Sequence, residues 1–272
     1  MELINKKYKK LEQIGEGMFG LIYKGENIRT RELVAIKVEP IEQDTKLLKN
    51  ESIIYQYLNN IDGIPIVKWF GKDDKYYYMV INLLGESLQS IINRKICFSL
   101  IVVLQIGIQI INILKTIHEK GLVHRDVKPD NFLIGLDRQS KKIHIIDFGF
   151  CKSYITDNIH NKMRETNNLI GSVSYASINA HNFIELSRRD DLESLGYMLI
   201  YFYLGSLPWQ QLKYDNFSIK LLKQNIIENN NIPIVLIEYF KYIRSLEYDE
   251  KPNYLLMIDN FNFEIELLKK TN

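Results

Sequence analysis

The sequence has little cysteine and no excess of one charge, and each scarcity excludes a class of protein. Its 272 residues include two cysteines, Cys97 and Cys151, which are too few for a disulfide framework and are typical of a reducing compartment. The formal net charge is +2 and the basic residues are spread out, unlike those of a strongly basic nucleic-acid-binding protein. No apolar run opens the chain, so we expect no signal peptide and an intracellular protein, in the cytoplasm or the nucleus.

Long apolar runs are scarce as well. The most apolar segment, Leu100–Leu114, is shorter than the roughly 20 residues that a membrane-spanning helix needs. Polar residues recur in it at helical spacing, at Gln105, Gln109 and Asn112. Because a lipid-facing helix would avoid such a polar stripe, we predict a nearly buried helix that runs from an N-cap at Ser99 towards a stop at Gly121.

What the chain does have is enough apolar sequence, 46% of its residues, for a large core. From Tyr8 to Pro40 the alternation of apolar and polar residues predicts three strands, and residues 64–84 predict two more around a polar turn at 72–75. Helical patterns follow Gly85 to the end. The sequence therefore predicts a single α+β domain over 1–272, with a sheet lobe at 1–82, a hinge at 83–86 and a helical lobe at 87–272.

The most informative stretch is GLVHRDVKPDNFLI at residues 121–134. Asp126 and Asn131, five residues apart after a strand-like turn, can point into one cleft, and Lys128 between them can neutralise charge there. An apolar strand at 143–146 then leads into Asp147, Phe148 and Gly149, which places a second acid beside the first. Two acids and an amide around one pocket suit magnesium and a nucleotide better than they suit a core.

A glycine-rich turn, Gly15–Gly20, lies between the first two predicted strands, where small residues let backbone amides approach phosphates. A lone pattern of this kind is a weak signal. Its position between two strands is unlike the strand-to-helix turn of dinucleotide-binding folds, and VAIK follows at residues 34–37 on the next strand.

Lys37 has apolar neighbours, and a buried ammonium without a partner would be costly. The helical pattern from Asp44 to Leu58 carries Glu51 at a position that can face inward, so we expect Glu51 to pair with Lys37. Glu42 is the competing candidate, but it follows Pro40 too closely to belong to the body of the helix.

A second pair of acids opens the long apolar helix after residue 187. An Asp at this position can cap the backbone of the 121–134 loop. For Asp190 the alternative of a plain N-cap is equally good, and Asp191 is its neighbour. Between the loop and this helix, residues 150–170 are polar and without periodicity.

These motifs resemble those of a eukaryotic protein kinase of the casein kinase 1 family, over nearly the whole chain. The specific ones are HRDVKPDNFLIGL, YASIN and SRRDDLESLGYMLIYFYLGSLPWQ. The resemblance implies the bilobal protein-kinase fold, with a small five-stranded antiparallel sheet lobe that carries one helix and a larger helical lobe. Lys128, Pro129 and Asp130 resemble serine/threonine kinases and argue against tyrosine kinases and small-molecule phosphotransferases.

By this resemblance, Asp126 accepts the proton of the substrate hydroxyl, Lys128 steadies the transferring phosphoryl, and Asn131 and Asp147 hold Mg²⁺. Lys37 and Glu51 orient the phosphates of ATP. The remaining implied nucleotide contacts include Ile81 as the gatekeeper and the backbones of Asn82 and Leu84 against adenine; the others are Ile14, Gly15, Glu16, Gly17, Met18, Phe19, Gly20, Leu21, Ile22 and Ala35.

The implied activity is transfer of the γ-phosphate of ATP to Ser or Thr of protein substrates, by a monomer without nucleic-acid or membrane partners. The alternative is a pseudokinase scaffold, which the intact set of Lys37, Asp126, Asn131 and Asp147 disfavours. We also expect activity without phosphorylation of residues 150–170, where the candidate acceptors are Ser153, Thr156 and Thr166.

The family prefers acidic or already phosphorylated substrates and holds the priming phosphate with an Arg, a Gly and a Lys. This chain has Ser174 at the Arg position and Gln211 at the Gly position, and Lys220 alone matches. Serine cannot replace the two-pronged grip of an Arg. We therefore predict a weakened dependence on priming. The alternative is that another arginine compensates, the candidates being Arg164, Arg188 and Arg189.

Overall fold

The computed structural model describes residues 3–17, 20–41, 47–95, 97–212 and 215–271. The chain forms two compact units, Met1–Glu86 with Leu133–Gly149, and Ser87–Phe132 with Phe150–Asn272. The first division falls at the end of the predicted hinge. The return of residues 133–149 to the first unit differs from the predicted lobe bounds. Backbone hydrogen bonds explain it, since Gly85 N donates to Ile134 O at 2.8 Å and Ile145 N donates to Gly63 O at 2.8 Å.

The first unit is built on a five-stranded antiparallel sheet with the order β1-β2-β3-β5-β4, which confirms the predicted strands. The strands are β1 (Tyr8–Gly17), β2 (Gly20–Asn27), β3 (Leu33–Pro40), β4 (Val67–Lys72) and β5 (Tyr76–Asn82). Alternate residues of β3, Val34, Ile36 and Val38, are buried together with Val80. This period of two gives the sheet one apolar face.

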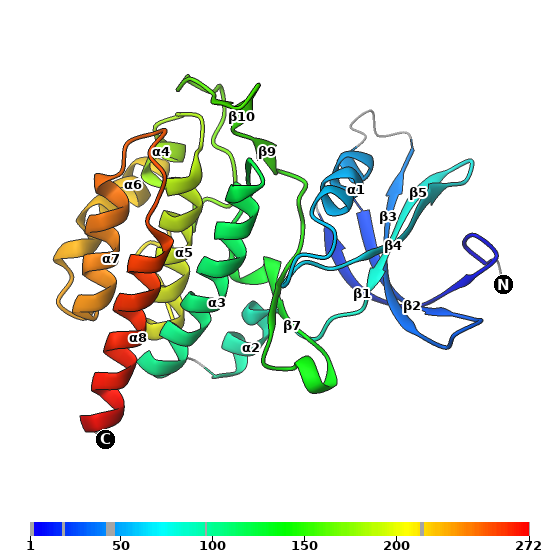
Figure 1. Ribbon diagram of the computed structural model, residues 1–272, viewed down its shortest axis with the longest axis horizontal. Coiled ribbons are helices and arrows are strands. Elements are labelled where there is room, and N and C mark those ends of the chain that lie inside the picture. Colours follow the sequence, from blue (N-terminus) through cyan, green and yellow to red (C-terminus); the bar gives the residue numbers. More distant parts are fainter. Residues whose placement is uncertain (1–2, 18–19, 42–46, 96, 213–214, 272) are drawn as a thin grey trace. The chain divides into compact units, whose positions relative to one another are not determined.

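The helix of the first unit is α1 (Leu47–Tyr57), which lies beside the sheet in Figure 1 and contacts β4 and β5. It buries Leu48, Glu51 and Tyr55. The predicted start at Asp44 and the competing Glu42 lie outside the described residues. β7 (Phe132–Ile134) and β8 (Ile143–Ile145) form a separate two-stranded ladder, joined through the short helix η2 (Asp137–Gln139).

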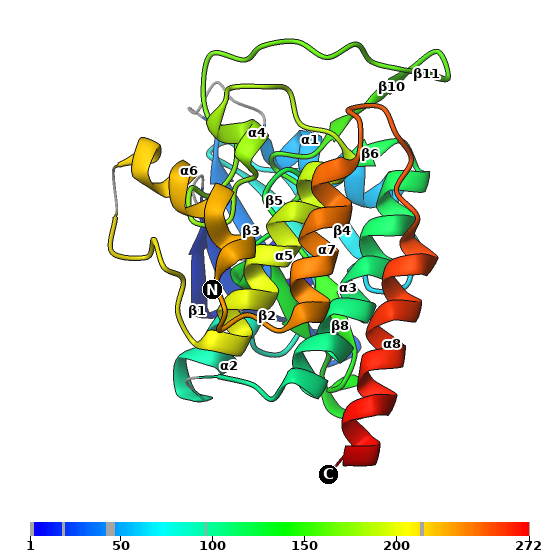
Figure 2. The same cartoon turned by 90° about the vertical axis from the view of Figure 1, so that its left-hand side faces the viewer.

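The second unit is mainly helical. Its helices are α2 (Leu88–Lys95), α3 (Leu100–Glu119), α4 (Ile178–His181), α5 (Arg188–Leu204), α6 (Asn216–Gln224), α7 (Ile234–Ser245) and α8 (Tyr254–Thr271), with the short turns η1 (Pro129–Asn131) and η3 (Asn225–Glu228). α5 is almost wholly buried and packs against α3 and α7, while α8 packs against α3 (Figure 2). Gly196 permits the close approach of α5 to α7, because a Cβ there would lie 2.6 Å from Phe240 Cζ.

Short strands complete the second unit. β6 (Leu122–Val123) pairs with β9 (Lys152–Ser153), and β10 (Ile155–Thr156) pairs with β11 (Ile159–His160). The pairing of β6 with β9 ties the segment after Gly149 to the loop that carries Asp126. Residues 150–170 thus contain short ladders, although their sequence shows no periodicity.

α3 begins directly after Ser99 and ends two residues before Gly121, as predicted, and among the described residues it is the one helix long and apolar enough to cross a membrane. Half of the most apolar 18-residue stretch of this helix is buried inside the protein, while Gln105 and Asn112 are exposed. This helix is therefore half-buried rather than nearly buried. Ser99 occupies the N-cap position without a side-chain capping bond, and Gly121 follows the helix with φ of 77°.

Candidate active site

A cluster of opposite charges lies inside the first unit. Lys37 Nζ, from β3, is 2.6 Å from Glu51 Oε2 on α1 and 3.4 Å from Asp147 Oδ1. The predicted contact between Lys37 and Glu51 is therefore present. Burial alone would lower the pKa of Lys37, but its attraction to both carboxylates outweighs burial and raises the pKa. Lys37 is thus a fixed positive charge beside a half-exposed carboxylate.

Tyr55 positions the backbone of Asp147, a contact that sequence reasoning did not foresee. The Asp147 amide donates to the Tyr55 hydroxyl at 3.2 Å, and the Phe148 ring packs edge-on against Tyr55 with centroids 4.8 Å apart. Asp147 itself has φ of 65°, in the left-handed region. α1 therefore supplies Glu51 and, through Tyr55, also holds the backbone of Asp147.

The predicted nucleotide contacts lie on adjacent strands of one sheet. Gly15 pairs with Ile22 and Gly17 with Gly20 across the β1–β2 turn, and Ala35 pairs with Ile81 between β3 and β5. The remaining predicted members of this group that the structure describes are Ile14 and Glu16 on β1, Leu21 on β2, Asn82 on β5, and Leu84 just beyond it. Met18 and Phe19 lie outside the described residues.

Two residues of this group have specific local roles. A Cβ at Gly20 would collide with the carbonyl oxygen of Val38, so the turn requires glycine there. The side chain of Asn82 accepts a hydrogen bond from the Ile66 amide at 2.8 Å. Asn82 thus ties β5 to the approach of β4.

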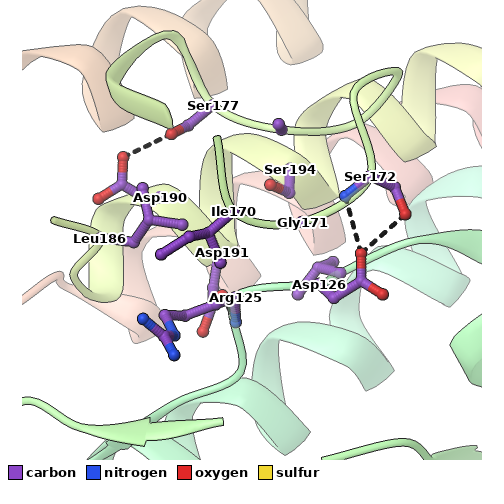
Figure 3. A pocket seen from close by; sticks show the side chains of 12 residues that line it. Arg125, Asp126, Ile170, Gly171, Ser172, Ser177, Leu186, Asp190, Asp191 and Ser194 are labelled. Atoms are coloured by element: carbon purple, nitrogen blue, oxygen red, sulfur yellow. Dashed lines mark hydrogen bonds between the residues drawn. The ribbon is translucent and has the colours of Figure 1, made fainter. Parts of the chain in front are cut away.

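The second cluster, in the helical unit, surrounds Asp126. Ser172 donates to Asp126 Oδ1 through its amide at 2.9 Å and its hydroxyl at 2.8 Å (Figure 3). Lys128 Nζ is 2.8 Å from Asp126 Oδ2 and donates to the Ser172 hydroxyl at 3.1 Å. Asn131 Nδ2 donates to the Asp126 carbonyl at 2.8 Å. The structure thus brings Asp126, Lys128 and Asn131 together, as their spacing predicts.

Ser172 was missed by sequence reasoning, although Gly171 before it is a usable signal. Gly171 has φ of 90°, and a Cβ there would lie 2.5 Å from the carbonyl oxygen of Arg125. Only glycine suits both conditions, so the chain can turn closely over the 121–134 loop. That close turn delivers the Ser172 hydroxyl to Asp126.

The two acids at the start of α5 divide their tasks. Asp191 accepts from the amides of His124 at 2.7 Å and Arg125 at 2.8 Å, and it lies 2.9 Å from His118 Nε2. Burial would raise the pKa of Asp191, but its contacts with His118 and His124 outweigh burial and lower it. Asp191 is therefore the acid that holds the backbone of the loop, as predicted for an Asp at this helix start.

Asp190 has the alternative role considered for it, that of a cap at the start of α5. It accepts from the Ser187 amide at 2.8 Å, at the first turn of α5, and from the Ser177 hydroxyl at 2.7 Å (Figure 3). Asn179 Nδ2 also donates to it, at 2.9 Å. Asp190 thus joins the starts of α5 and α4.

Two of the three predicted anion-binding residues make hydrogen bonds within the protein, and the third is exposed. The Ser174 carbonyl accepts from the Trp209 indole at 2.8 Å, Gln211 is exposed, and Lys220 Nζ is 3.0 Å from Asn182 Oδ1. Lys223, one helical turn beyond Lys220, is fully buried and donates to the carbonyls of Val173 at 2.8 Å and Ala176 at 2.6 Å. This buried amine, which the sequence analysis did not single out, fixes the backbone on both sides of Ser174.

The three arginines considered as compensation have other partners. Arg188 donates to the Tyr154 hydroxyl and the Asp249 carbonyl, and Arg189 donates to the Leu246 carbonyl. Arg164 pairs with Glu185 at 2.9 Å.

Each unit by itself offers an oxygen donor that suits a magnesium ion arriving with a nucleotide. Among the residues that the structure describes, no group of three or more His, Cys, Asp or Glu side chains could hold a metal on its own. Magnesium commonly takes one or two carboxylates together with substrate phosphates and waters. Asp147 offers a carboxylate with 36% side-chain exposure, and Asn131 offers an amide oxygen. Both are hard oxygen donors of the kind that Mg²⁺ prefers.

The sequence also matches a model of a known protein family. A model described as protein kinase domain matches residues 8–251. The matched stretch contains both charged clusters and the turn between β1 and β2.

Proposed function

We propose that this chain, which belongs to the protein kinase domain family and is therefore a phosphotransferase, is an active kinase of the casein kinase 1 type that phosphorylates Ser or Thr. The observation that carries the proposal is the contact of the Ser172 hydroxyl with Asp126 at 2.8 Å. A carboxylate that accepts this hydrogen bond has the reach that a proton acceptor for a substrate hydroxyl needs. Lys128 beside it supplies a positive charge for the phosphoryl group.

In this proposal the charged residues share the work of positioning and charge stabilisation, which dominate phosphoryl transfer. Lys37, held by Glu51, would contact the phosphates of ATP, and the glycine turn between β1 and β2 would cover them. Asp126 orients the acceptor hydroxyl and takes its proton. Asp147 and Asn131 would hold magnesium, which neutralises charge on the phosphates when it is bound.

Two features support the finer assignment to serine and threonine substrates. Lys128 precedes Pro129 in the manner of serine/threonine kinases, and its ammonium contacts both Asp126 and Ser172. A pseudokinase scaffold would not need all four of the residues Lys37, Asp126, Asn131 and Asp147, whereas catalysis needs them all. We therefore place catalysis ahead of scaffolding.

The test is transfer of label from [γ-³²P]ATP to casein with magnesium, followed by phosphoamino-acid analysis. We expect phosphoserine or phosphothreonine from the wild type and at least about 10²-fold less from Asp126→Asn, with Asp157→Asn as the matched control at an exposed acid. A folded wild type that binds ATP without transfer would support the scaffold, and phosphotyrosine would overturn the acceptor assignment. Transfer to a small molecule but not to protein would indicate a small-molecule phosphotransferase.

We also propose acidic substrates with a weakened dependence on a priming phosphate. Ser174 cannot grip a phosphate as an arginine does, and Arg188 and Arg189 donate to other groups. A phosphate three residues before the acceptor should therefore raise turnover by less than about tenfold, which corresponds to roughly 1.4 kcal/mol. The measurement compares primed and unprimed forms of one peptide on the wild type and on Ser174→Arg. A strong preference in the wild type that the substitution leaves unchanged would contradict the proposal.

A further inference from the structure

Glu185, which precedes α5, joins three cations from separate segments of the helical unit. Its Oε1 is 3.1 Å from Arg125 NH1, and its Oε2 is 2.8 Å from Lys152 Nζ and 2.9 Å from Arg164 NH2. Arg125 adjoins Asp126, Lys152 lies on β9, and Arg164 lies near the end of the 150–170 segment. One carboxylate thus ties the Asp126 loop to both ends of that segment.

The surroundings favour a permanently charged Glu185. Its side chain is 9% exposed, whereas that of Arg164 is 65% exposed. Burial alone would raise the pKa of Glu185, but the hydrogen bonds from Lys152 and Arg164 outweigh burial and lower it. A buried carboxylate with three cationic partners stays ionised at neutral pH, and its removal would leave those cations without their shared anion.

Arg125 carries the effect of this carboxylate to the site. Its Nε donates to the Phe150 carbonyl at 2.7 Å, and its amide is held by Asp191 at 2.8 Å. The residue has φ of 68°, a left-handed conformation that costs free energy unless contacts hold it. Because Asp126 is the next residue, the direction of Arg125 influences where the Asp126 carboxylate lies.

We propose that Glu185 is a positioning residue that fixes the Asp126 loop and the 150–170 segment without phosphorylation. Many kinases order the corresponding segment when an arginine pairs with a phosphorylated residue. Here a carboxylate encoded in the sequence supplies that negative charge permanently. The inference rests on the proposed kinase function for its catalytic consequence, but its structural part stands apart from activity.

The test compares Glu185→Gln, which removes the charge at nearly constant size, with Glu185→Asp, which keeps it. Glu165→Gln is the matched control, since Glu165 is an exposed acid near Arg164. Each variant is assayed at a temperature where circular dichroism shows it folded. We expect Glu185→Gln to lower kcat by about tenfold or more, because small misplacements of a catalytic group have effects of this size. The KM for ATP should stay within about threefold of the wild type, because Lys37 does not contact Glu185. Glu185→Asp should retain more of kcat than Glu185→Gln does.

Hydrogen exchange measured by mass spectrometry supplies a readout that does not need activity. In Glu185→Gln we expect faster exchange in peptides from residues 150–165, with exchange in α8 unchanged. A Glu185→Gln variant with wild-type kcat, equal losses in Glu185→Gln and Glu185→Asp, or unchanged exchange over 150–165 would overturn the inference. If the wild type itself transfers no phosphate, the proposed function fails, and the exchange comparison still decides the role of Glu185.

Discussion

The two charged clusters are stabilised in different ways. Lys37 and Glu51 neutralise each other directly across 2.6 Å, and the Glu51 side chain is only 3% exposed. Asp126 instead receives several donors, while Asp191 holds the backbone of its loop from the other side. The first cluster therefore couples the site to stability, because loss of one partner leaves a buried charge. In the second cluster, Asp126 can be replaced by the neutral asparagine, which has nearly the same size, with little change in packing.

The largest expected effect comes from the acids themselves. Asp126→Asn should lower kcat by about 10²–10⁴-fold, the range for loss of a general acid or base, while the fold stays intact. Asp147→Asn should abolish magnesium-dependent transfer, because the change is nearly isosteric but removes a metal-binding charge. Steady-state kinetics and circular dichroism of each variant check this, with Asp157→Asn as control. Near-wild-type turnover in either folded variant would make its assignment wrong.

The ion pair should show its effect in stability. Lys37→Met leaves the buried Glu51 carboxylate without its cation and should cost about 3–5 kcal/mol of unfolding free energy. Lys37→Met combined with Glu51→Leu removes both charges and should cost less than the single change. Urea unfolding of the single and double variants measures the difference. If the double variant were less stable than Lys37→Met, the pair would not couple the site to stability as we describe.

A smaller effect should appear on acidification. His181 accepts a hydrogen bond from buried Lys223 at 3.1 Å, and burial, together with the charge of Lys223, lowers its pKa to about 4. An unfolded histidine titrates near 6.5, so the folded state resists protonation and loses stability as the pH falls from 6.5 towards 4. The loss should reach about 3 kcal/mol at most, at 1.36 kcal/mol per unit of pKa difference.

His181→Gln isolates this contribution, because glutamine keeps an acceptor for Lys223 but does not titrate. Urea unfolding at pH 7 and pH 4.5 should show a smaller acid loss in the variant than in the wild type. The same acid loss in both proteins would mean that His181 is not its source.

The smallest expected effect is that of phosphatase treatment. If Glu185 supplies the charge that orders residues 150–170, removal of phosphate from Ser153, Thr156 or Thr166 should change kcat by less than about twofold. A twofold change in kcat corresponds to an activation free-energy difference of less than about 0.5 kcal/mol. Activity is measured before and after treatment, and after renewed incubation with ATP. Activity that disappears and returns on autophosphorylation would show that these sites, rather than Glu185 alone, control the segment.

The sequence predicted those parts of the fold and site that local patterns encode. The five strands follow from alternation, and the partner of Lys37 follows from helical periodicity together with the cost of a buried ammonium. Glu185 and Lys223 could not be found this way, and the glycine before Ser172 is a local signal only for a close turn, not for the partner of that serine. Each acts on a segment distant in the chain, and only the packing of α5 and α6 with the 121–134 and 170–177 segments brings them there.

The choice between Asp190 and Asp191 shows the same limit at close range. Both lie in the first turn of α5 and both suit a cap by residue type. Which of them reaches the amides of His124 and Arg125 depends on how the helix is turned against the loop, and a one-residue step on a helix changes the facing direction by about 100°. The sequence narrows the role to two neighbours, and the packing selects Asp191.

The most direct test of this account separates nucleotide binding from transfer. Calorimetric titration with ATP and magnesium should show that Asp126→Asn binds nucleotide within about threefold of the wild type although its kcat falls by at least about 10²-fold. The reason is that Asp126 acts on the acceptor hydroxyl in the transition state and does not contribute to binding of ATP in the ground state. Lys37→Met should bind nucleotide much more weakly. If Asp126→Asn lost nucleotide binding as severely as Lys37→Met, or if it transferred phosphate at nearly the wild-type rate, the division of roles between the two clusters would be contradicted.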